Sequence, residues 1–329
     1  MFINAHTHLY SALSSFGMPA PAEPPRDFLQ ILERIWWRLD RALDEPALGA
    51  SARHYLAHAR LDGTAAVVDH HESPRFIDGS LDVLAGACEE FGMPAVLCYG
   101  ATERNGGRDE ARRGLDECRR FIRANRRPHV VGLVGLHASF TVSDETIREA
   151  GALCRELDTV LHIHVAEDAA DVEDARRRGY AGPLQRLIAL DALPAGSILA
   201  HGVHLAPDEV KMASDRGCWF VQNPRSNRQN KVGYPSGLGA AARVALGTDG
   251  FASNMRDEER ALVQASEEAG ETFAAIAGRL AAGWRMVEDR LGLGRRAIEA
   301  EASRVPSAAA VDAVDAAARE QAARLWARW

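Results

Sequence analysis

The chain has 329 residues, of which 47% are hydrophobic, and 46 acidic side chains outnumber 39 basic ones to give a formal net charge of −7. This length and apolar content suffice for one large α/β domain or two smaller domains. The negative charge argues against a surface that binds nucleic acid or an anionic membrane, and no run approaches the roughly 20 apolar residues that span a bilayer.

Short apolar runs recur along the chain, with amphipathic stretches between them. The runs are rich in Val, Leu and Ile without strict polar alternation, which is typical of strands covered on both faces. The intervening stretches, such as SLDVLAGACEEFG and DETIREAGALCREL, have helical periodicity and begin with Ser or Asp. Eight βα units in one chain predict a (β/α)8 TIM barrel of the α/β class. The predicted strands cover residues 2–5, 65–69, 95–99, 130–136, 160–163, 197–200, 219–222 and 243–246.

Two segments fall outside this alternation. Residues 26–60 are long enough for two helices and would form a lid or pocket wall at the mouth of the barrel. Within this insertion Trp36 is a candidate substrate contact, and ordinary packing of Trp36 and Trp37 is the alternative. Residues 256–329 are predicted to be helical and to dock on the barrel exterior. We therefore predict one domain over residues 1–329, with an insertion and a helical C-terminal region.

Histidines gather where the predicted strands end. Nine of the twelve histidines lie at or just beyond a strand end, which is the end where barrels of this type carry their functional residues. His6 and His8 sit at alternate positions, and residues i and i+2 of a strand point to the same side. Neutral imidazole is a common metal ligand, so this clustering predicts a metal site. The strand-end segments are HTH, DHHESP, GLHASF, HIHVAE, AHGVHL and LGTDG.

The motifs HTH, HASF, HVAE, AHGVH, NPRSN and GTDG occur in the order found in the amidohydrolase superfamily, which this chain resembles over most of its length. Within that superfamily it is most similar to the aminohydrolase and chlorohydrolase branch, which includes deaminases of guanine, adenosyl compounds and triazines. The phrases FINAHTHLYS, DHHESP and GLHASFTVSDET are especially similar to one aminohydrolase group of that branch.

The resemblance implies a role for each matching residue. His6, His8, His164 and Asp249 would bind one divalent metal ion, Zn²⁺ in the first place and Fe²⁺ as the alternative. Asp249 would also have a catalytic role, because it would hydrogen-bond the metal-bound water. Glu167 would be the proton shuttle, and His201 would assist at the attacking water and the leaving group. Two-metal members carry a bridging lysine at the end of the fourth strand, where this chain has His137, so a single ion is expected.

Elementary chemistry supports the same assignment. Three imidazoles and one carboxylate suit Zn²⁺ or Fe²⁺ and leave a position for water, whose pKa the ion lowers toward neutrality. Deamination also needs a proton delivered to the leaving nitrogen, and one carboxylate can collect and return it. Glu167, three residues after His164, has suitable spacing; a helix N-terminal charge is the alternative explanation for it.

Substrate contacts are expected from the insertion, from the DHHESP segment and from the later strand ends. His137 would contact the substrate in place of the bridging lysine. Arg225 of NPRSN could meet an anionic substrate group, with an exposed loop arginine as the alternative. His162 and His204 match no metal position and are interpreted as structural. The full set of candidate substrate-binding residues is His71, Glu72, Trp36, His137, Arg225 and Asn227.

The chain also departs from the branch it resembles. Members usually have about 60 residues before HTH and strands after the barrel that form a small β-sandwich, whereas here HTH begins at residue 6 and the C-terminal region is helical. We therefore expect a bare barrel, and an upstream start codon is the alternative. Five cysteines without C-x-x-C spacing and an N-terminal segment unlike a signal peptide favour the cytoplasm.

The sequence thus predicts a metal-dependent aminohydrolase that releases ammonia from a nitrogen heterocycle or an amidine-like carbon. Its substrate would be a small molecule, and a homodimer is left open. The alternatives are a decarboxylase of the same superfamily, a chlorohydrolase or amide hydrolase, and a non-catalytic barrel that keeps a metal.

Overall fold

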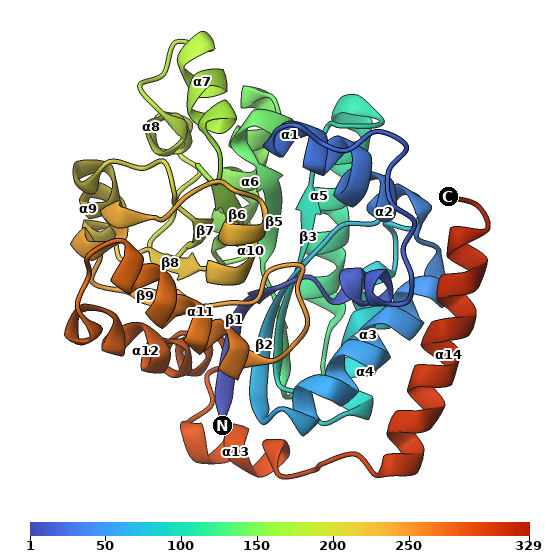
Figure 1. The fold of residues 1–329 in the computed structure, drawn as a ribbon. Coiled ribbons are helices and arrows are strands. Elements are labelled where there is room, and N and C mark those ends of the chain that lie inside the picture. Colours follow the sequence, from blue (N-terminus) through green and yellow to red (C-terminus); the bar gives the residue numbers. More distant parts are fainter.

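A sheet of parallel strands curls into a barrel and is wrapped by helices, in a computed structural model that describes residues 1–329 apart from the side chain of Leu280 (Figure 1). Neighbouring strands follow the order β1-β2-β3-β5-β6-β7-β8-β9, and β4 pairs with β3. The predicted TIM barrel is therefore confirmed. The strands are β1 (Phe2–Thr7), β2 (Thr64–His71), β3 (Ala95–Ala101), β4 (Val130–Gly132), β5 (Val134–Ala138), β6 (Leu161–Val165), β7 (Ile198–His201), β8 (Trp219–Gln222) and β9 (Val244–Leu246).

The strand predicted over residues 130–136 is instead two short strands. The first, β4, pairs with residues 95–97 of β3, and β5 pairs with Gly100 and Ala101 after a break at Leu133. Close packing explains why β5 needs glycine beside β3, because a Cβ on Gly135 would lie 2.3 Å from the carbonyl oxygen of Tyr99. Leu133 lies between the two strands, and its backbone nitrogen donates to the carbonyl oxygen of Leu97 at 2.8 Å. On its other side β5 pairs with β6.

The helices cover the outside of the barrel, and the insertion and the C-terminal region add to them. The insertion forms α1, a π-helical turn at Leu32–Trp36, α2 and α3, and in Figure 1 α1 and α2 lie at the end where the strands finish. The helices are α1 (Phe28–Ile31), α2 (Trp37–Ala42), α3 (Glu45–Leu61), α4 (Ser80–Glu90), α5 (Gly107–Ala124), α6 (Asp144–Glu156), α7 (Ala169–Arg177), α8 (Pro183–Ala189), α9 (Pro207–Asp215), α10 (Pro224–Gln229), α11 (Met255–Glu268), α12 (Phe273–Leu291), α13 (Arg295–Ala302) and α14 (Ala308–Trp326).

Apolar packing closes the end of the barrel where the strands begin. Side chains from α12 and α13, among them Trp284, Met286 and Ile298, join the strand residues Ile3 and Val221 in one buried cluster. Burial of such side chains is worth roughly 1.5–3 kcal/mol each. The polar strand ends are consequently left at the opposite end of the barrel, which is where the site lies.

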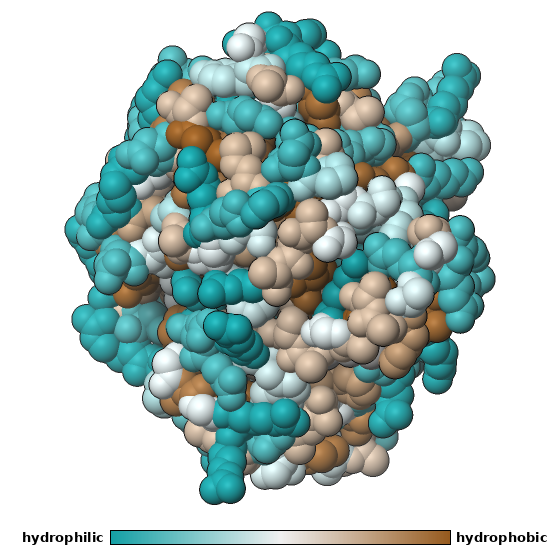
Figure 2. All heavy atoms as spheres, turned by 90° about the vertical axis from the view of Figure 1, so that its left-hand side faces the viewer, coloured by the Kyte–Doolittle hydropathy of each residue, from teal (hydrophilic) through white to brown (hydrophobic). Residues whose placement is uncertain are grey.

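The outer helical layer keeps its polar side chains in water. The face at the left of Figure 1 is mainly hydrophilic, with apolar side chains scattered over it (Figure 2). Among the described residues, every helix is too short or too polar to cross a membrane.

The barrel closes where β1 meets the segment that follows β9. Thr7 and Asp249 form a parallel bridge, and the backbone nitrogen of Asp249 donates to the carbonyl oxygen of His6 at 3.0 Å. Glycine at position 247 permits the approach, because a Cβ there would lie 2.6 Å from the same His6 oxygen. The closure therefore places the residues of HTH directly beside those of GTDG.

A buried network centred on Tyr55 of α3 supports this closure. The Tyr55 hydroxyl lies 2.7 Å from Thr7 Oγ1, 2.8 Å from Thr248 Oγ1 and 2.9 Å from Asn4 Nδ2. The Asn4 side chain also accepts from the backbone nitrogen of Thr248 at 3.0 Å. The Tyr55 hydroxyl thus connects β1 with the segment that follows β9, and we call this line of closure the seam.

We predict that Tyr55→Phe lowers the free energy of unfolding by about 1–3 kcal/mol, because it leaves buried polar partners unsatisfied. Tyr180→Phe is the matched control: its hydroxyl donates to Asp144 at 2.6 Å on a partly exposed surface, and we expect a smaller loss. Urea denaturation of both variants measures the difference, and equal losses would contradict a structural role for the network.

Candidate metal centre

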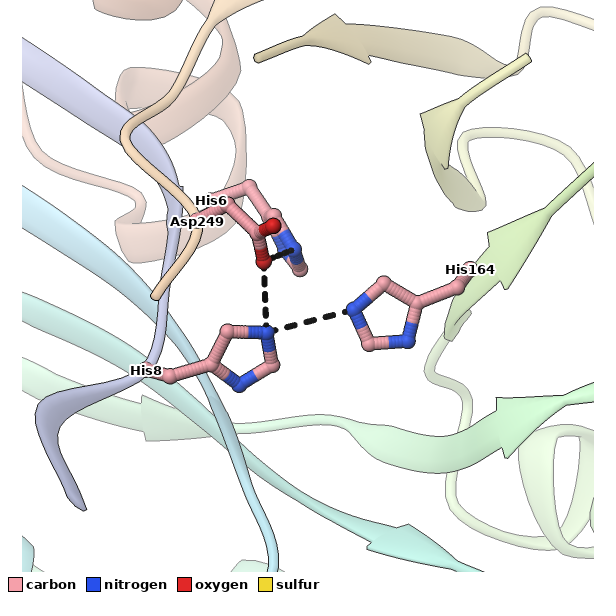
Figure 3. A group of neighbouring side chains, drawn as sticks. All are labelled: His6, His8, His164 and Asp249. Atoms are coloured by element: carbon pink, nitrogen blue, oxygen red, sulfur yellow. Dashed lines mark hydrogen bonds and ion pairs between the residues drawn. The ribbon is translucent and has the colours of Figure 1, made fainter. Parts of the chain in front are cut away.

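Four side chains from three separate strand ends converge at the open end of the barrel (Figure 3). His6 lies on β1 and His8 directly follows it, His164 lies on β6, and Asp249 follows β9. Each offers one ligand atom, and these atoms all lie within 4.8 Å of one another. Asp249 Oδ1 is 2.8 Å from His8 Nε2 and 3.3 Å from His6 Nε2.

Hydrogen bonds to backbone carbonyls orient two of the imidazoles. His8 Nδ1 lies 2.5 Å from the carbonyl oxygen of His70, and His164 Nδ1 lies 2.8 Å from that of His137. A carbonyl oxygen only accepts, so each Nδ1 carries a hydrogen and each Nε2 is directed into the centre. The two Nε2 atoms are 3.2 Å apart, and two lone pairs at that distance repel unless a positive charge lies between them. The donor set therefore fits a metal cation.

The third imidazole is held by a further histidine. His6 Nδ1 lies 3.0 Å from Nε2 of His162, so the histidine predicted to be structural supports a candidate ligand from behind. His6 Nε2, on the other edge of the ring, is buried and makes no well-formed hydrogen bond with any described group. This unsatisfied nitrogen faces the same point as the lone pairs of His8 and His164.

The protonation states suit ligation. Burial lowers the pKa of His6 to about 3 and that of His164 well below its usual value, so both rings are neutral. Burial alone would raise the pKa of Asp249, but the His8 ring at 2.8 Å and the His6 ring at 3.3 Å hold it well below the usual range. Burial likewise would lower the pKa of His8, but Asp249 and Glu72 outweigh it and raise that pKa to about 9. A proton on His8 thus takes the place of the cation when no ion is bound.

Three of the six described non-glycine residues with positive φ angles lie at these strand ends. His201, Asp249 and Ala166 have φ angles of +73°, +54° and +47°, which non-glycine residues adopt at a cost of about 1–3 kcal/mol each. The Asp249 carboxylate is fixed by a short hydrogen bond from Ser226 Oγ, donated from α10. These conformations aim side chains inward that an extended strand would direct elsewhere.

Glu167 and His201 form a second pair beside the four candidate ligands. His201 Nε2 lies 3.5 Å from Glu167 Oε2 and 3.9 Å from Asp249 Oδ2. Asn230 donates to Glu167 Oε1 at 3.2 Å, and Asn227 Oδ1 contacts His201 Nδ1 at 2.9 Å. Burial raises the pKa of Glu167 to about 7, although His201 partly opposes the shift. Near neutral pH this carboxyl can therefore both take up and release a proton.

An open cavity lies against these groups. Aromatic side chains from the insertion and from the turn after β5 form one wall, and Glu72 and His137 contribute polar atoms. Residues lining the cavity include His8, Tyr10, Phe28, Leu32, Trp36, Trp37, Glu72, His137, Phe140, His164, Glu167, Asn230 and Asp249.

The candidate substrate residues divide into two groups. Trp36, Glu72 and His137 line the cavity. The others lie behind it: His71 Nε2 is 2.8 Å from Ser73 Oγ, Asn227 orients His201, and Arg225 forms an ion pair with Glu258 and donates to the carbonyl oxygen of Ala252 at 2.7 Å. A contact of these three with a substrate stays a prediction.

Several cavity residues were not singled out from the sequence. Tyr10 and Phe140 follow the HTH and HAS motifs closely, so proximity to those motifs could have indicated them. Asn230 and Ser226 lie within or just after NPRSN, but which of its polar residues face the site depends on the short helix α10. Nothing in the periodicity indicates that the insertion turns Trp37 toward His137, where the ring centroids are 6.1 Å apart.

Comparison with known proteins identifies relatives for most of the chain. The profile of the amidohydrolase family matches residues 2–278. The chain is 29% identical over 257 residues to 5-methylthioadenosine/S-adenosylhomocysteine deaminase 2 of Archaeoglobus fulgidus, covering 76% of this chain and 58% of that protein. It is 28% identical over 269 residues to the 8-oxoguanine deaminase of Pseudomonas aeruginosa, covering 77% and 59%. The chain thus spans less than two thirds of the length of these curated relatives.

Solved structures show the same fold. An adenosine deaminase from Xanthomonas campestris with bound zinc superposes with a TM-score of 0.73 at 25% identity, covering 89% of this chain and 67% of that one. The guanine deaminase of E. coli superposes with a TM-score of 0.72 at 18% identity, covering 89% and 68%.

We predict that the affinity of the centre for zinc rises with pH. Below about pH 9 the proton on His8 must leave before an ion can bind, so the association constant should increase about tenfold per pH unit and level off above that pH. Competition against a chelator of known proton affinity measures this dependence. An affinity that does not change with pH would contradict the exchange of one proton for the ion.

Proposed function

Because this chain belongs to the amidohydrolase family, we propose that it is a metal-dependent aminohydrolase that displaces ammonia from an amidine-like carbon of a nitrogen heterocycle. One observation carries the proposal: the Glu167–His201 pair lies beside the four converging metal-ligand candidates and faces an aromatic cavity. The relatives named as deaminases of purine compounds support the same class of reaction.

His6, His8, His164 and Asp249 would hold one divalent ion, and zinc is our first assignment because nitrogen and carboxylate donors suit it. When bound, such an ion supplies a hydroxide nucleophile at neutral pH by lowering the pKa of water. The carbonyls of His70 and His137 hold two of the rings in the required orientation. We place the protein in a reducing cytoplasm, which is supported by its five free, buried cysteines.

Glu167 is the proposed acid and base. Its Oε2 faces His201, and Oε1 accepts from Asn230, so the carboxyl is fixed at the edge of the cavity. With a pKa near 7 it can accept a proton as water attacks the ring carbon and donate that proton to the departing nitrogen. One residue thus serves both halves of the reaction without leaving its position.

His201 is the proposed partner of Glu167 in the reaction. Asn227 Oδ1 fixes its Nδ1, which leaves Nε2 directed at Glu167 and Asp249. A ring held in this way can stabilise charge that develops as the carbon becomes tetrahedral. Asn227 would then be a positioning residue, acting through His201.

The cavity favours a flat ring with N–H groups at one edge. Trp36, Trp37 and Phe140 offer apolar surface for a planar ring, and Arg104 stacks on Trp37 at 4.8 Å. Glu72 contributes a carboxylate that is only 1% exposed. Gly100 makes room for it, since a Cβ there would lie 2.5 Å from Glu72 Oε1. Oε1 of Glu72 lies 2.8 Å from His70 Nδ1. We therefore propose that the other carboxylate oxygen, Oε2, binds a ring N–H or amino group of the substrate.

We predict that Glu167→Gln lowers kcat by a factor of about 10² to 10⁴, because the amide cannot transfer the proton, while zinc content stays unchanged. The substrate for the assay comes from an ammonia-release screen of purines, pterins and triazines with the zinc-loaded protein. Glu173→Gln, an exposed substitution on α7, is the matched control and should keep full activity.

Undiminished turnover by Glu167→Gln would reject the assigned role. Release of carbon dioxide or chloride instead of ammonia would move the protein to the decarboxylase or chlorohydrolase alternative.

We also predict that Glu72→Gln lowers kcat/KM by roughly 10- to 100-fold for a substrate that presents N–H donors, since a charge-assisted hydrogen bond is lost. The loss should disappear for an analogue in which that N–H is methylated. A variant that loses the same factor on both compounds would show that Glu72 has no part in recognition.

A further inference from the structure

A second group of metal-ligating side chains lies on the outside of the barrel, where α14 packs along α3 (Figure 1). His54 and His58 are one turn apart on α3, and Asp315 belongs to α14, more than 250 residues later in the chain. Positions i and i+4 of a helix share one face, so both imidazoles point at the neighbouring helix. Tyr55, between them, faces the barrel seam instead.

The three side chains converge on a single atom. His54 Nδ1 lies 2.7 Å and His58 Nε2 lies 2.9 Å from the same oxygen, Oδ1 of Asp315. One potential ligand atom from each side chain lies within 4.8 Å of the other two. One carboxylate oxygen has two lone pairs, so Oδ1 accepts from both rings when no ion is bound. The same three donor atoms, brought together from two helices, would surround a divalent cation that takes the place of the two N–H protons.

We propose that His54, His58 and Asp315 form a second metal site, for Zn²⁺ or a similar divalent transition-metal ion, that clamps α14 onto α3. Imidazole nitrogens are common ligands of such transition-metal ions, whereas Mg²⁺ and Ca²⁺ prefer oxygen ligands. Two imidazoles and one carboxylate therefore favour a transition-metal ion. The side chains of His54, His58 and Asp315 are 15%, 37% and 19% exposed, so water can reach the ion and complete its coordination. The site is independent of the proposed aminohydrolase activity.

A metal ion at this site would strengthen the attachment of α14 to α3. α14 buries three side chains fully, namely Ala318, Ala322 and Leu325, and two of them are small. Val314, Trp326 and Trp329 pack against the same apolar cluster while partly exposed. Two polar contacts add to this packing: Trp326 Nε1 donates to the carbonyl oxygen of Phe16 at 2.9 Å, and Arg328 pairs with Asp44 at 2.9 Å. A metal bridge would add one strong connection near the middle of the helix.

An ion at this second site would also restrain the segment that follows His8 of the inner centre. The His54 ring packs edge-on against Phe16 at 4.8 Å. Phe16 ends the 3₁₀ turn Leu9–Ser15, which begins directly after the candidate ligand His8. An ion at this second site would therefore hold the outer end of the segment that positions His8 and Tyr10.

Zinc stoichiometry tests the proposal. After dialysis against buffered zinc, the wild-type chain should retain two ions and His58→Ala one, as measured by mass spectrometry of the metal content. Asp249→Asn should lose the ion of the inner centre and keep the outer one. His129→Ala is the matched control, since this surface histidine is 3.8 Å from Glu301 and belongs to no such group. It should retain both ions.

Hydrogen exchange supplies a second readout that does not depend on the inner centre. Zinc should slow amide exchange in α14 of the Asp249→Asn variant, and adding His58→Gln should abolish the effect. Should His58→Ala fail to fold, Asp315→Asn is measured in its place. A zinc content that His58→Ala leaves unchanged, or zinc protection of α14 that survives loss of His58, would overturn the proposal.

Discussion

The structure depends on two imidazole lone pairs that face one another. The Nδ1 atoms of His8 and His164 are committed to backbone carbonyls, so their Nε2 atoms, 3.2 Å apart, direct lone pairs at the same point. Such an arrangement is stable only around a positive charge, and Asp249 supplies the compensating negative charge 2.8 Å from His8 Nε2. In the protein without metal, the raised pKa of His8 lets a proton fill that place; with metal, the proton must leave.

The barrel fold brings these two imidazole nitrogens together. His8 and His164 are fixed on different strands, and Asp249 reaches them only because the barrel closes between β1 and the residues after β9. The Tyr55 network and Gly247 hold that seam. The strained backbone at His201 and Asp249 is then offset by the packing of the whole sheet. The closure between β1 and the residues after β9 thus contributes both to the stability of the fold and to the geometry of the metal centre.

Much of this could be predicted from the sequence, because local patterns carry it. Apolar runs with a βα rhythm specify the barrel, and alternate positions in HTH place two rings on one side of a strand. Other features could not be predicted, because they depend on contacts between distant segments. The division of the predicted fourth strand at Leu133 is set by how β4 and β5 pair with β3, and the fit of Glu72 depends on Gly100 one strand away. Asn227 has the composition of a substrate contact, yet its partner is His201, which only the fold reveals.

Anomalous diffraction from crystals grown with zinc tests the central claim most directly. The account predicts a peak bonded to Nε2 of His6, His8 and His164 and to a carboxylate oxygen of Asp249, at about 2.0–2.2 Å from each donor. An ion bound elsewhere in the cavity, with the His8 and His164 nitrogens still facing one another across an empty gap at saturating zinc and high pH, would contradict it.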